Sequence, residues 1–298
     1  MAAPPGYGGR SRRAASTSRP KLLAVDLDGT LLDPKSGAPH ARDLAALRAL
    51  SASGVAVSIA TGRLYSGTRT TAEALGIRGP VACVDGSHVV SAHDHATLVH
   101  LGIRGAHADA LREVIARSGA ATFVFARDAI IHDDAGSAFL GYVSTWSMDV
   151  RHTAAVVDHD LWRHDEGLTA VVAVGDSAQI GRAAESIRRD LADAAQVAIF
   201  PIRRLPGQWG MVVRAAGGTK GSALKWLAAH HGFEMDETVC VGDWMNDVPM
   251  LEIAGRSFAM GQAPDEVKRT ATDVLTETSE EGGGIARVVR ELFGVDVA

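Results

Sequence analysis

The sequence has little cysteine, no long apolar run and no excess of positive charge, and each absence excludes a class of protein. Only Cys83 and Cys240 are present, both within apolar segments that predict buried strands, so we expect core thiols in a reducing, cytoplasmic compartment rather than a disulfide framework. No stretch approaches the ~18 consecutive apolar residues of a membrane helix, which excludes a membrane partner. The formal net charge of −5 offers no basic field for nucleic acid.

What is present is enough apolar sequence for a core, preceded by a polar N-terminal segment. The 298 residues are 46% hydrophobic, which suits two domains. Residues 1–20 contain four arginines and several prolines, glycines and serines but no acidic residue. This composition predicts a disordered tail, although an organelle-targeting peptide has a similar bias. We therefore expect the folded protein to start near Lys21, and the composition leaves its oligomeric state open.

Strand and helix patterns alternate at both ends of the chain. Residues 22–27 are a short apolar run that ends in acidic residues, which is typical of a buried parallel strand that stops at a functional loop. Right-handed crossovers between such units predict an α/β fold with a doubly wound parallel sheet. The further elements expected in this sheet are helices at 41–52, about 65–75 and 221–230, and strands at 55–60, 81–84 and 238–241.

The middle of the chain has a different pattern. Strand candidates at residues 121–125 and 168–174 flank helix candidates at 107–117 and 180–191, which indicates an inserted α+β domain. The domains predicted are a disordered tail at 1–20, a core at 21–86 and 209–298, and an inserted domain at 87–208.

Residues 26–30 place two carboxylates at the end of the first predicted strand. Asp26 and Asp28 are costly in such a position unless a cation or a reaction needs them. Asp26 can attack phosphorus, while Asp28 can protonate the leaving oxygen and later activate water. Gly29 allows a tight turn around a phosphate. A loop in which aspartate caps a turn remains the alternative for this segment.

Two other segments offer groups that bind phosphate. Thr61, Gly62 and Arg63 follow the predicted strand at 55–60, so the hydroxyl and the following backbone amides can bind phosphate oxygens. Taken alone, an ordinary helix cap by Thr61 explains this segment as well. Lys220 precedes a predicted helix, where its ammonium group can steady both a transferring phosphoryl group and the carboxylate pair. A solvated lysine is the alternative.

Residues 242–247 supply carboxylates at the end of a third strand. The oxygens of Asp243 and Asp247 are hard ligands that suit Mg²⁺. They can instead cap a helix that begins near Asn246. Because open α/β sheets bind ligands at the carboxyl ends of their strands, these segments together predict one site more strongly than any of them does alone.

In this order, the four segments resemble the motifs of the haloacid dehalogenase superfamily. The large insertion before Lys220 is similar to that of its Cof-type sugar-phosphatase branch, and the resemblance covers nearly all of residues 21–298. It implies a Rossmann-like core with a mobile α/β cap that selects the substrate. It also implies a magnesium-dependent phosphatase that acts on a small phosphorylated metabolite through an aspartyl-phosphate intermediate.

The resemblance also implies a role for each matching residue. The catalytic residues implied are Asp26 as nucleophile, Asp28 as general acid/base and Lys220. The phosphate-binding and supporting residues implied are Thr61, with Gly62 and Arg63 beside it, Asn246 and Asp247. The Mg²⁺ ligands implied are Asp26, the backbone carbonyl of Asp28, and Asp243.

The sequence departs from the family pattern where substrate contacts are expected to differ. Asp85 and Gly86 stand where relatives usually have Asn-Gly, and Gln262 stands in place of the asparagine of Gly-Asn-Ala. The asparagine that is common before the last helix is missing from residues 276–284. These changes affect the substrate more than the reaction.

Two other functions compete with hydrolysis. A phosphomutase uses the same aspartyl phosphate but returns the phosphoryl group to a sugar, and only family analogy with a large cap favours hydrolysis. A phosphometabolite-binding protein without turnover would not need Asp26, Asp28, Lys220 and Asp243 together.

Overall fold

The computed structural model describes residues 15–202 and 205–296, which fold into two compact units. The first unit contains the chain up to Ala60, residues 74–79 and the chain from Lys220 onward. The second contains residues 61–73 and 80–219. The second unit therefore extends beyond the insertion expected at 87–208, and the extent of a substrate-selecting cap stays a prediction.

Part of the predicted tail lies against the first unit. The backbone N–H of Ser16 donates a hydrogen bond to the Gly255 carbonyl (3.0 Å), and the Ser18 hydroxyl donates to Asp236 (2.6 Å). These contacts begin before Lys21, where the sequence predicts the fold to start. Residues 1–14 of the predicted tail lie outside the described residues.

The first unit is built on a five-stranded sheet in the order β14-β13-β12-β1-β2, and every neighbouring pair is parallel. All four residues of β1 are fully buried, as expected for a parallel strand covered on both faces. This confirms the predicted Rossmann-like core. The strands are β1 (Leu22–Val25), β2 (Ala56–Ile59), β12 (Thr238–Gly242), β13 (Arg256–Ala259) and β14 (Asp273–Val274).

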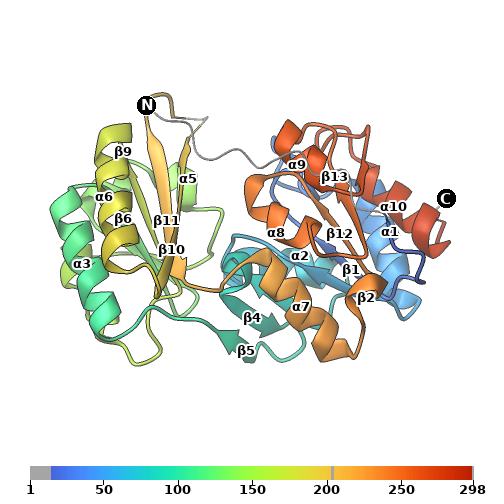
Figure 1. Ribbon diagram of the computed structural model, residues 1–298, viewed down its shortest axis with the longest axis horizontal. Coiled ribbons are helices and arrows are strands. Elements are labelled where there is room, and N and C mark those ends of the chain that lie inside the picture. The colour runs from blue at the N-terminus through green and yellow to red at the C-terminus, as the bar shows by residue number, and fades with distance from the viewer. Residues whose placement is uncertain (1–14, 203–204, 297–298) are drawn as a thin grey trace. The chain divides into compact units, whose positions relative to one another are not determined.

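Helices cover both faces of this sheet. The helices are α1 (Ala41–Ala52), α7 (Lys220–His231), α8 (Val248–Leu251), α9 (Asp265–Thr270) and α10 (Gly284–Phe293). Helices α1 and α10 pack together on one face, while α7 and α8 pack together on the other (Figure 1). The sheet is therefore doubly wound, and the carboxyl ends of its strands meet at one edge.

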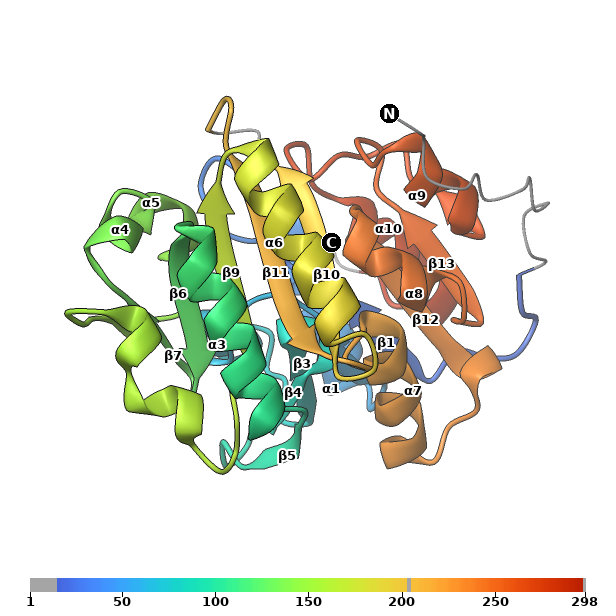
Figure 2. The same cartoon turned by 60° about the vertical axis from the view of Figure 1, so that its left-hand side comes forward.

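The second unit contains a six-stranded, largely antiparallel sheet in the order β10-β11-β9-β6-β7-β8. Helices α3 and α6 lie side by side across one face of this sheet (Figure 2). Buried side chains such as Leu111, Ile187 and Val171 fill the layer between these helices and the sheet. The elements are α3 (Ala106–Ser118), β6 (Ala121–Ala126), β7 (Ala129–His132), α4 (Asp134–Ser137), α5 (Leu140–Val143), β8 (Val150–His152), β9 (Ala170–Gly175), α6 (Ser177–Asp190), β10 (Ala195–Pro201) and β11 (Trp209–Ala215).

The strand expected at 81–84 is present as β3 (Pro80–Cys83), but it does not extend the parallel sheet as predicted. It forms an antiparallel sheet with β4 (His88–Ser91) and β5 (Thr97–His100). The tight turn at residues 84–86 reverses the chain at once and pairs β3 with β4. Helix α2 (Ser66–Ala74) precedes β3, close to the predicted bounds. Among the helices of the described ranges, none is both long and apolar enough to cross a membrane.

A buried carboxylate joins the two helices on one face of the parallel sheet. Asp43 of α1 is 2% exposed and accepts hydrogen bonds from the backbone N–H groups of Gly283 and Ala286, each 2.8 Å, at the start of α10. These N–H groups have no partner within their own helix.

We expect Asp43→Ala to lower the free energy of unfolding by about 2 kcal/mol, because it leaves two part-buried donors unpaired. Urea unfolding followed by circular dichroism measures this change. Asp109→Ala, which removes an exposed aspartate from the first turn of α3, is the matched control. Equal unfolding midpoints for the two variants would contradict the assignment.

Candidate active site

The site begins where β1 and β12 end side by side. Val25 pairs with Val241 in the parallel ladder, and the Asp26 N–H donates to the Val241 carbonyl (3.1 Å). Asp26 is therefore the first residue beyond β1, and Asp243 directly follows β12. The strand register thus places two carboxylates together at the carboxyl edge of the sheet.

Lys220 binds two of the carboxylates at this edge. It is the first residue of α7 and is fully buried, and its Nζ lies 2.6 Å from Asp26 Oδ1 and 2.6 Å from Asp247 Oδ1. A buried ammonium group is stable only when it is paired in this way. The alternative of a solvated lysine is therefore wrong.

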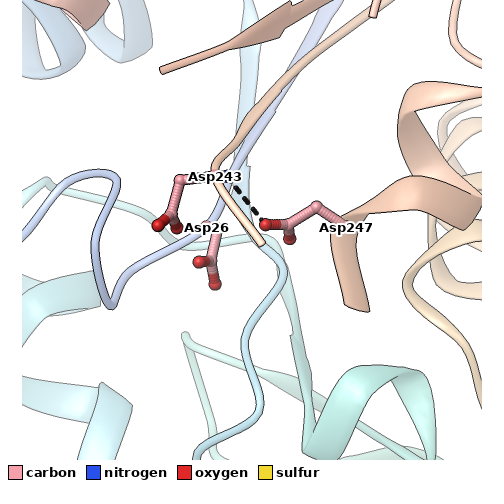
Figure 3. Close-up of side chains that lie close together, drawn as sticks. All are labelled: Asp26, Asp243 and Asp247. Carbon is pink, nitrogen blue, oxygen red and sulfur yellow. Dashed lines mark hydrogen bonds between the residues drawn. The ribbon is translucent and has the colours of Figure 1, made fainter. Parts of the chain in front are cut away.

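Asp247 binds the backbone of the turn after β12 in addition to Lys220. Its Oδ2 accepts hydrogen bonds from the backbone N–H groups of Asp243 (2.9 Å) and Trp244 (2.8 Å). Figure 3 shows Asp247 approaching the other two carboxylates from the opposite side, with its bond to Asp243 dashed. Both oxygens of Asp247 are therefore engaged by donors of this chain.

Asp243 is held by two residues to which the sequence assigned no role. Its Oδ1 accepts a hydrogen bond from the Thr30 hydroxyl (3.1 Å), and its Oδ2 lies 3.5 Å from Gln262 Nε2. Gln262 Nε2 also donates to the Gly29 carbonyl (2.5 Å), and its Oε1 accepts from the Ser279 N–H (3.2 Å). Thr30 could have been found as the last residue of its motif, whereas the position of Gln262 depends on the fold.

Gly29 is required by this close packing. It has φ 82°, a left-handed conformation that side chains disfavour, and a Cβ atom there would lie 2.5 Å from Asp243 Oδ2. The turn after Asp28 can therefore approach the Asp243 carboxylate only with glycine at position 29.

Burial sets the electrostatics of the cluster. It raises the pKa of Asp26 and raises the pKa of Asp243 to about 7, and the charge of Asp247 adds to both shifts. Burial by itself lowers the pKa of Lys220, but the charges of Asp247 and Asp26 outweigh it and the net pKa is raised. The carboxylates thus share one fixed positive charge, and a further cation would favour their ionised forms.

These carboxylates fit a hard metal ion. One oxygen from each of Asp26, Asp243 and Asp247 lies within 4.8 Å of the others, and all three residues are buried. An all-oxygen donor set suits Mg²⁺ rather than a soft metal. Asp247 binds the Lys220 ammonium through one oxygen and two backbone N–H groups through the other, and the assignment of Asp26 and Asp243 as the side-chain ligands stays a prediction. The Asp28 side chain is exposed and lies outside this cluster, so its predicted carbonyl ligand stays a prediction.

The predicted phosphate-binding segment belongs to the second unit. Thr61 is fully buried, and its Oγ1 accepts a hydrogen bond from the Arg63 N–H (3.2 Å). It does not cap α2, which begins at Ser66. Asn246 lies half-buried in the short 3₁₀ turn Met245–Asp247. The phosphate-binding roles of Thr61, Gly62, Arg63 and Asn246 stay predictions.

Comparison with known proteins places this chain among hydrolases. Residues 23–289 match the profile of a family described as haloacid dehalogenase-like hydrolase. Pyridoxal phosphate phosphatase YbhA of Escherichia coli is 27% identical over 274 residues, which are 88% of this chain and 95% of the relative. The 5-amino-6-(5-phospho-D-ribitylamino)uracil phosphatase YitU of Bacillus subtilis is 26% identical, with 93% of this chain and 99% of the relative covered.

The fold has solved counterparts. A haloacid dehalogenase-like hydrolase from Bacteroides thetaiotaomicron superposes with a TM-score of 0.76 at 21% identity, covering 92% of this chain and all of that one. At this identity the likeness shows the fold alone, which is the predicted core with its cap domain.

The buried carboxylates predict that Mg²⁺ stabilises the protein. At free Mg²⁺ about 100 times its dissociation constant, we expect a gain near 2.7 kcal/mol, visible as a higher thermal midpoint than in excess chelator. Asp243→Asn should abolish most of this gain because it removes a buried anion. Asp273→Asn, at the half-buried ion pair with Arg256, is the control, and equal Mg²⁺ responses in the two variants would place the ion elsewhere.

Proposed function

This chain belongs to the haloacid dehalogenase-like hydrolases and is a phosphomonoester hydrolase, and we propose that it hydrolyses a small phosphorylated metabolite through an aspartyl phosphate on Asp26. One observation carries the proposal, namely that Lys220 joins Asp26 to Asp247 beside Asp243 at the ends of β1 and β12. Phosphoryl transfer depends mainly on positioning and charge neutralisation. The cluster positions a nucleophile beside a lysine, and its excess of carboxylates favours the cation that would neutralise the phosphoryl oxygens.

In the first step, an oxygen of Asp26 attacks phosphorus and the bond from phosphorus to the ester oxygen breaks. Asp28 gives its proton to the leaving oxygen, so the alcohol departs neutral. In the second step, Asp28 takes a proton from water as that water attacks the same phosphorus. The bond to Asp26 then breaks and inorganic phosphate is released, which restores both aspartates. The exposure of Asp28 suits a group that must exchange protons with the leaving group and with water.

Lys220 favours the ionised form of the nucleophile. Because burial raises the pKa of Asp26, a neutral carboxyl would otherwise form and would attack phosphorus poorly. The ammonium group at 2.6 Å opposes that shift and holds the carboxylate in one orientation. Asp247 fixes Lys220 from the other side. Mg²⁺ held by Asp26, Asp243 and the Asp28 carbonyl would supply the remaining positive charge for the phosphoryl oxygens.

The phosphate and the rest of the substrate are proposed to be recognised by different segments. Thr61, Gly62 and Arg63 supply a hydroxyl and backbone N–H groups for the phosphate, with Asn246 as a further donor. The inserted residues 87–208 are proposed to select the alcohol part, since the core residues 21–86 and 209–298 recognise little beyond phosphate and metal.

Replacing the nucleophile tests the reaction. We expect Asp26→Asn to abolish phosphate release from a panel of sugar phosphates, nucleotides and pyridoxal phosphate, assayed with Mg²⁺, because the amide cannot form the phosphoenzyme. Intact-protein mass spectrometry after acid quench should show the phosphorylated form only in the parent protein. Asp273→Asn, the same chemical change at a distant ion pair, should keep both signals. Activity near the parent level in Asp26→Asn would sink the mechanism.

Asp28→Asn separates the two steps. An aryl phosphate with a good leaving group needs no proton from Asp28, but hydrolysis of the phosphoenzyme still needs a base. We therefore expect steady turnover to fall by about 10²–10⁴ while a rapid burst of aryl alcohol appears, with phosphoenzyme accumulating. Stopped-flow absorbance measures the burst. A variant that turns over as fast as the parent would remove Asp28 from this role.

A further inference from the structure

The turn after β3 has an uncommon backbone. Val84, Asp85 and Gly86 are three successive residues with positive φ, at 48°, 50° and 93°. The left-handed region is costly for most side chains and especially so for a β-branched residue such as Val84. A conformation of this kind persists only where the surrounding contacts enforce it.

The contacts of this turn lead to the proposed phosphate-binding segment. The N–H of Asp85 donates to the Thr61 carbonyl (2.8 Å), and the N–H of Val84 donates to the Arg63 carbonyl (2.9 Å). Thr61 in turn donates its N–H to the carbonyl of Ala82 in β3 (2.9 Å). The backbone of residues 61–63 is therefore held at both ends by β3 and the turn that follows it.

A buried ion pair fixes the same turn from its other side. The Asp85 carboxylate contacts Nη1 of Arg214, near the end of β11, and each residue is only 8% exposed. Burial lowers the pKa of Arg214 to about 10, so the guanidinium still carries its charge at neutral pH. Neither its Nε nor its Nη1 makes a hydrogen bond within the described residues, so the ion pair with Asp85 compensates the buried guanidinium through charge.

We propose that Asp85 and Arg214 are positioning residues that set how tightly residues 61–63 bind phosphate. The ion pair holds the strained turn, and the turn's two N–H groups hold the carbonyls of Thr61 and Arg63. The proposal rests on the assignment of residues 61–63 as phosphate ligands. It also gives Asp85, which replaces the usual asparagine, a partner of opposite charge in β11.

Asp85→Asn is the most informative variant. Asparagine tolerates a left-handed backbone as aspartate does, so the change removes the charge without altering the preference of the turn. Arg214→Met removes the other charge while keeping a long side chain. Asp273→Asn removes one charge from the ion pair of Arg256 and Asp273 in the first unit and serves as the matched control.

The measurement is direct binding of inorganic phosphate by calorimetry in the presence of Mg²⁺, which needs no turnover. We expect Asp85→Asn and Arg214→Met each to weaken phosphate binding by about tenfold or more. The double variant should bind phosphate no more weakly than the single variant with the lower affinity, because the two residues act as one unit. The KM for an aryl phosphate should rise in parallel while kcat changes little. Asp273→Asn should bind phosphate like the parent.

A purely structural ion pair gives a different result. Both single variants would then have lower thermal midpoints but unchanged phosphate affinity and KM, which overturns the proposal. If Asp85→Asn does not fold, Arg214→Lys, which keeps the charge but loses the planar fork, should weaken phosphate binding in the folded protein. Parent-like binding in that variant counts against the proposal. If the parent protein binds phosphate but hydrolyses none of the phosphate esters tested, that result counts instead against the proposed hydrolysis.

Discussion

The burial of several negative charges around one lysine is the constraint on which the site depends. Asp26, Asp243 and Asp247 are each less than a tenth exposed, and Lys220 between two of them is fully buried. Removing charges from water is costly unless they are paired. The cluster therefore needs the lysine at a fixed position. Helix α7 begins at Lys220, and the lysine's ammonium group contacts the carboxylates of Asp26 and Asp247.

The sheet order explains why these residues meet. The chain runs from β1 to β2 on one side of the sheet and later returns to β12 on the other side of β1. The direction of winding changes between β1 and β12, and the carboxyl ends of two such strands form the usual ligand site of open α/β sheets. Asp26 and Asp243 directly follow these two strands, so the carboxylates that suit a metal ion lie where this sheet topology is expected to bind a ligand.

Strain is concentrated in the second unit where phosphate recognition is proposed. A turn of three left-handed residues is bonded to the backbone of residues 61–63 and to a buried arginine. Such conformations persist where neighbours over-determine them. The second unit therefore combines the inserted sheet with the segment proposed to bind phosphate, rather than containing the insertion alone.

The sequence by itself was sufficient for most elements of the core and for the strand-end carboxylates, because apolar runs and the acidic residues that end them are local signals. The bounds of α1 and the strands β1, β2 and β12 follow from such patterns. It did not predict the antiparallel pairing of β3 with β4, since that depends on the φ angles of a three-residue turn. It also could not predict that both oxygens of Asp247 accept hydrogen bonds, one from Lys220 and the other from the backbone. The contacts of Gln262 with Gly29 and Asp243 were equally unpredicted. So was the ion pair of Asp85 with Arg214. Each of these contacts joins side chains whose proximity is decided by strand register and turn conformation, which only the tertiary structure determines.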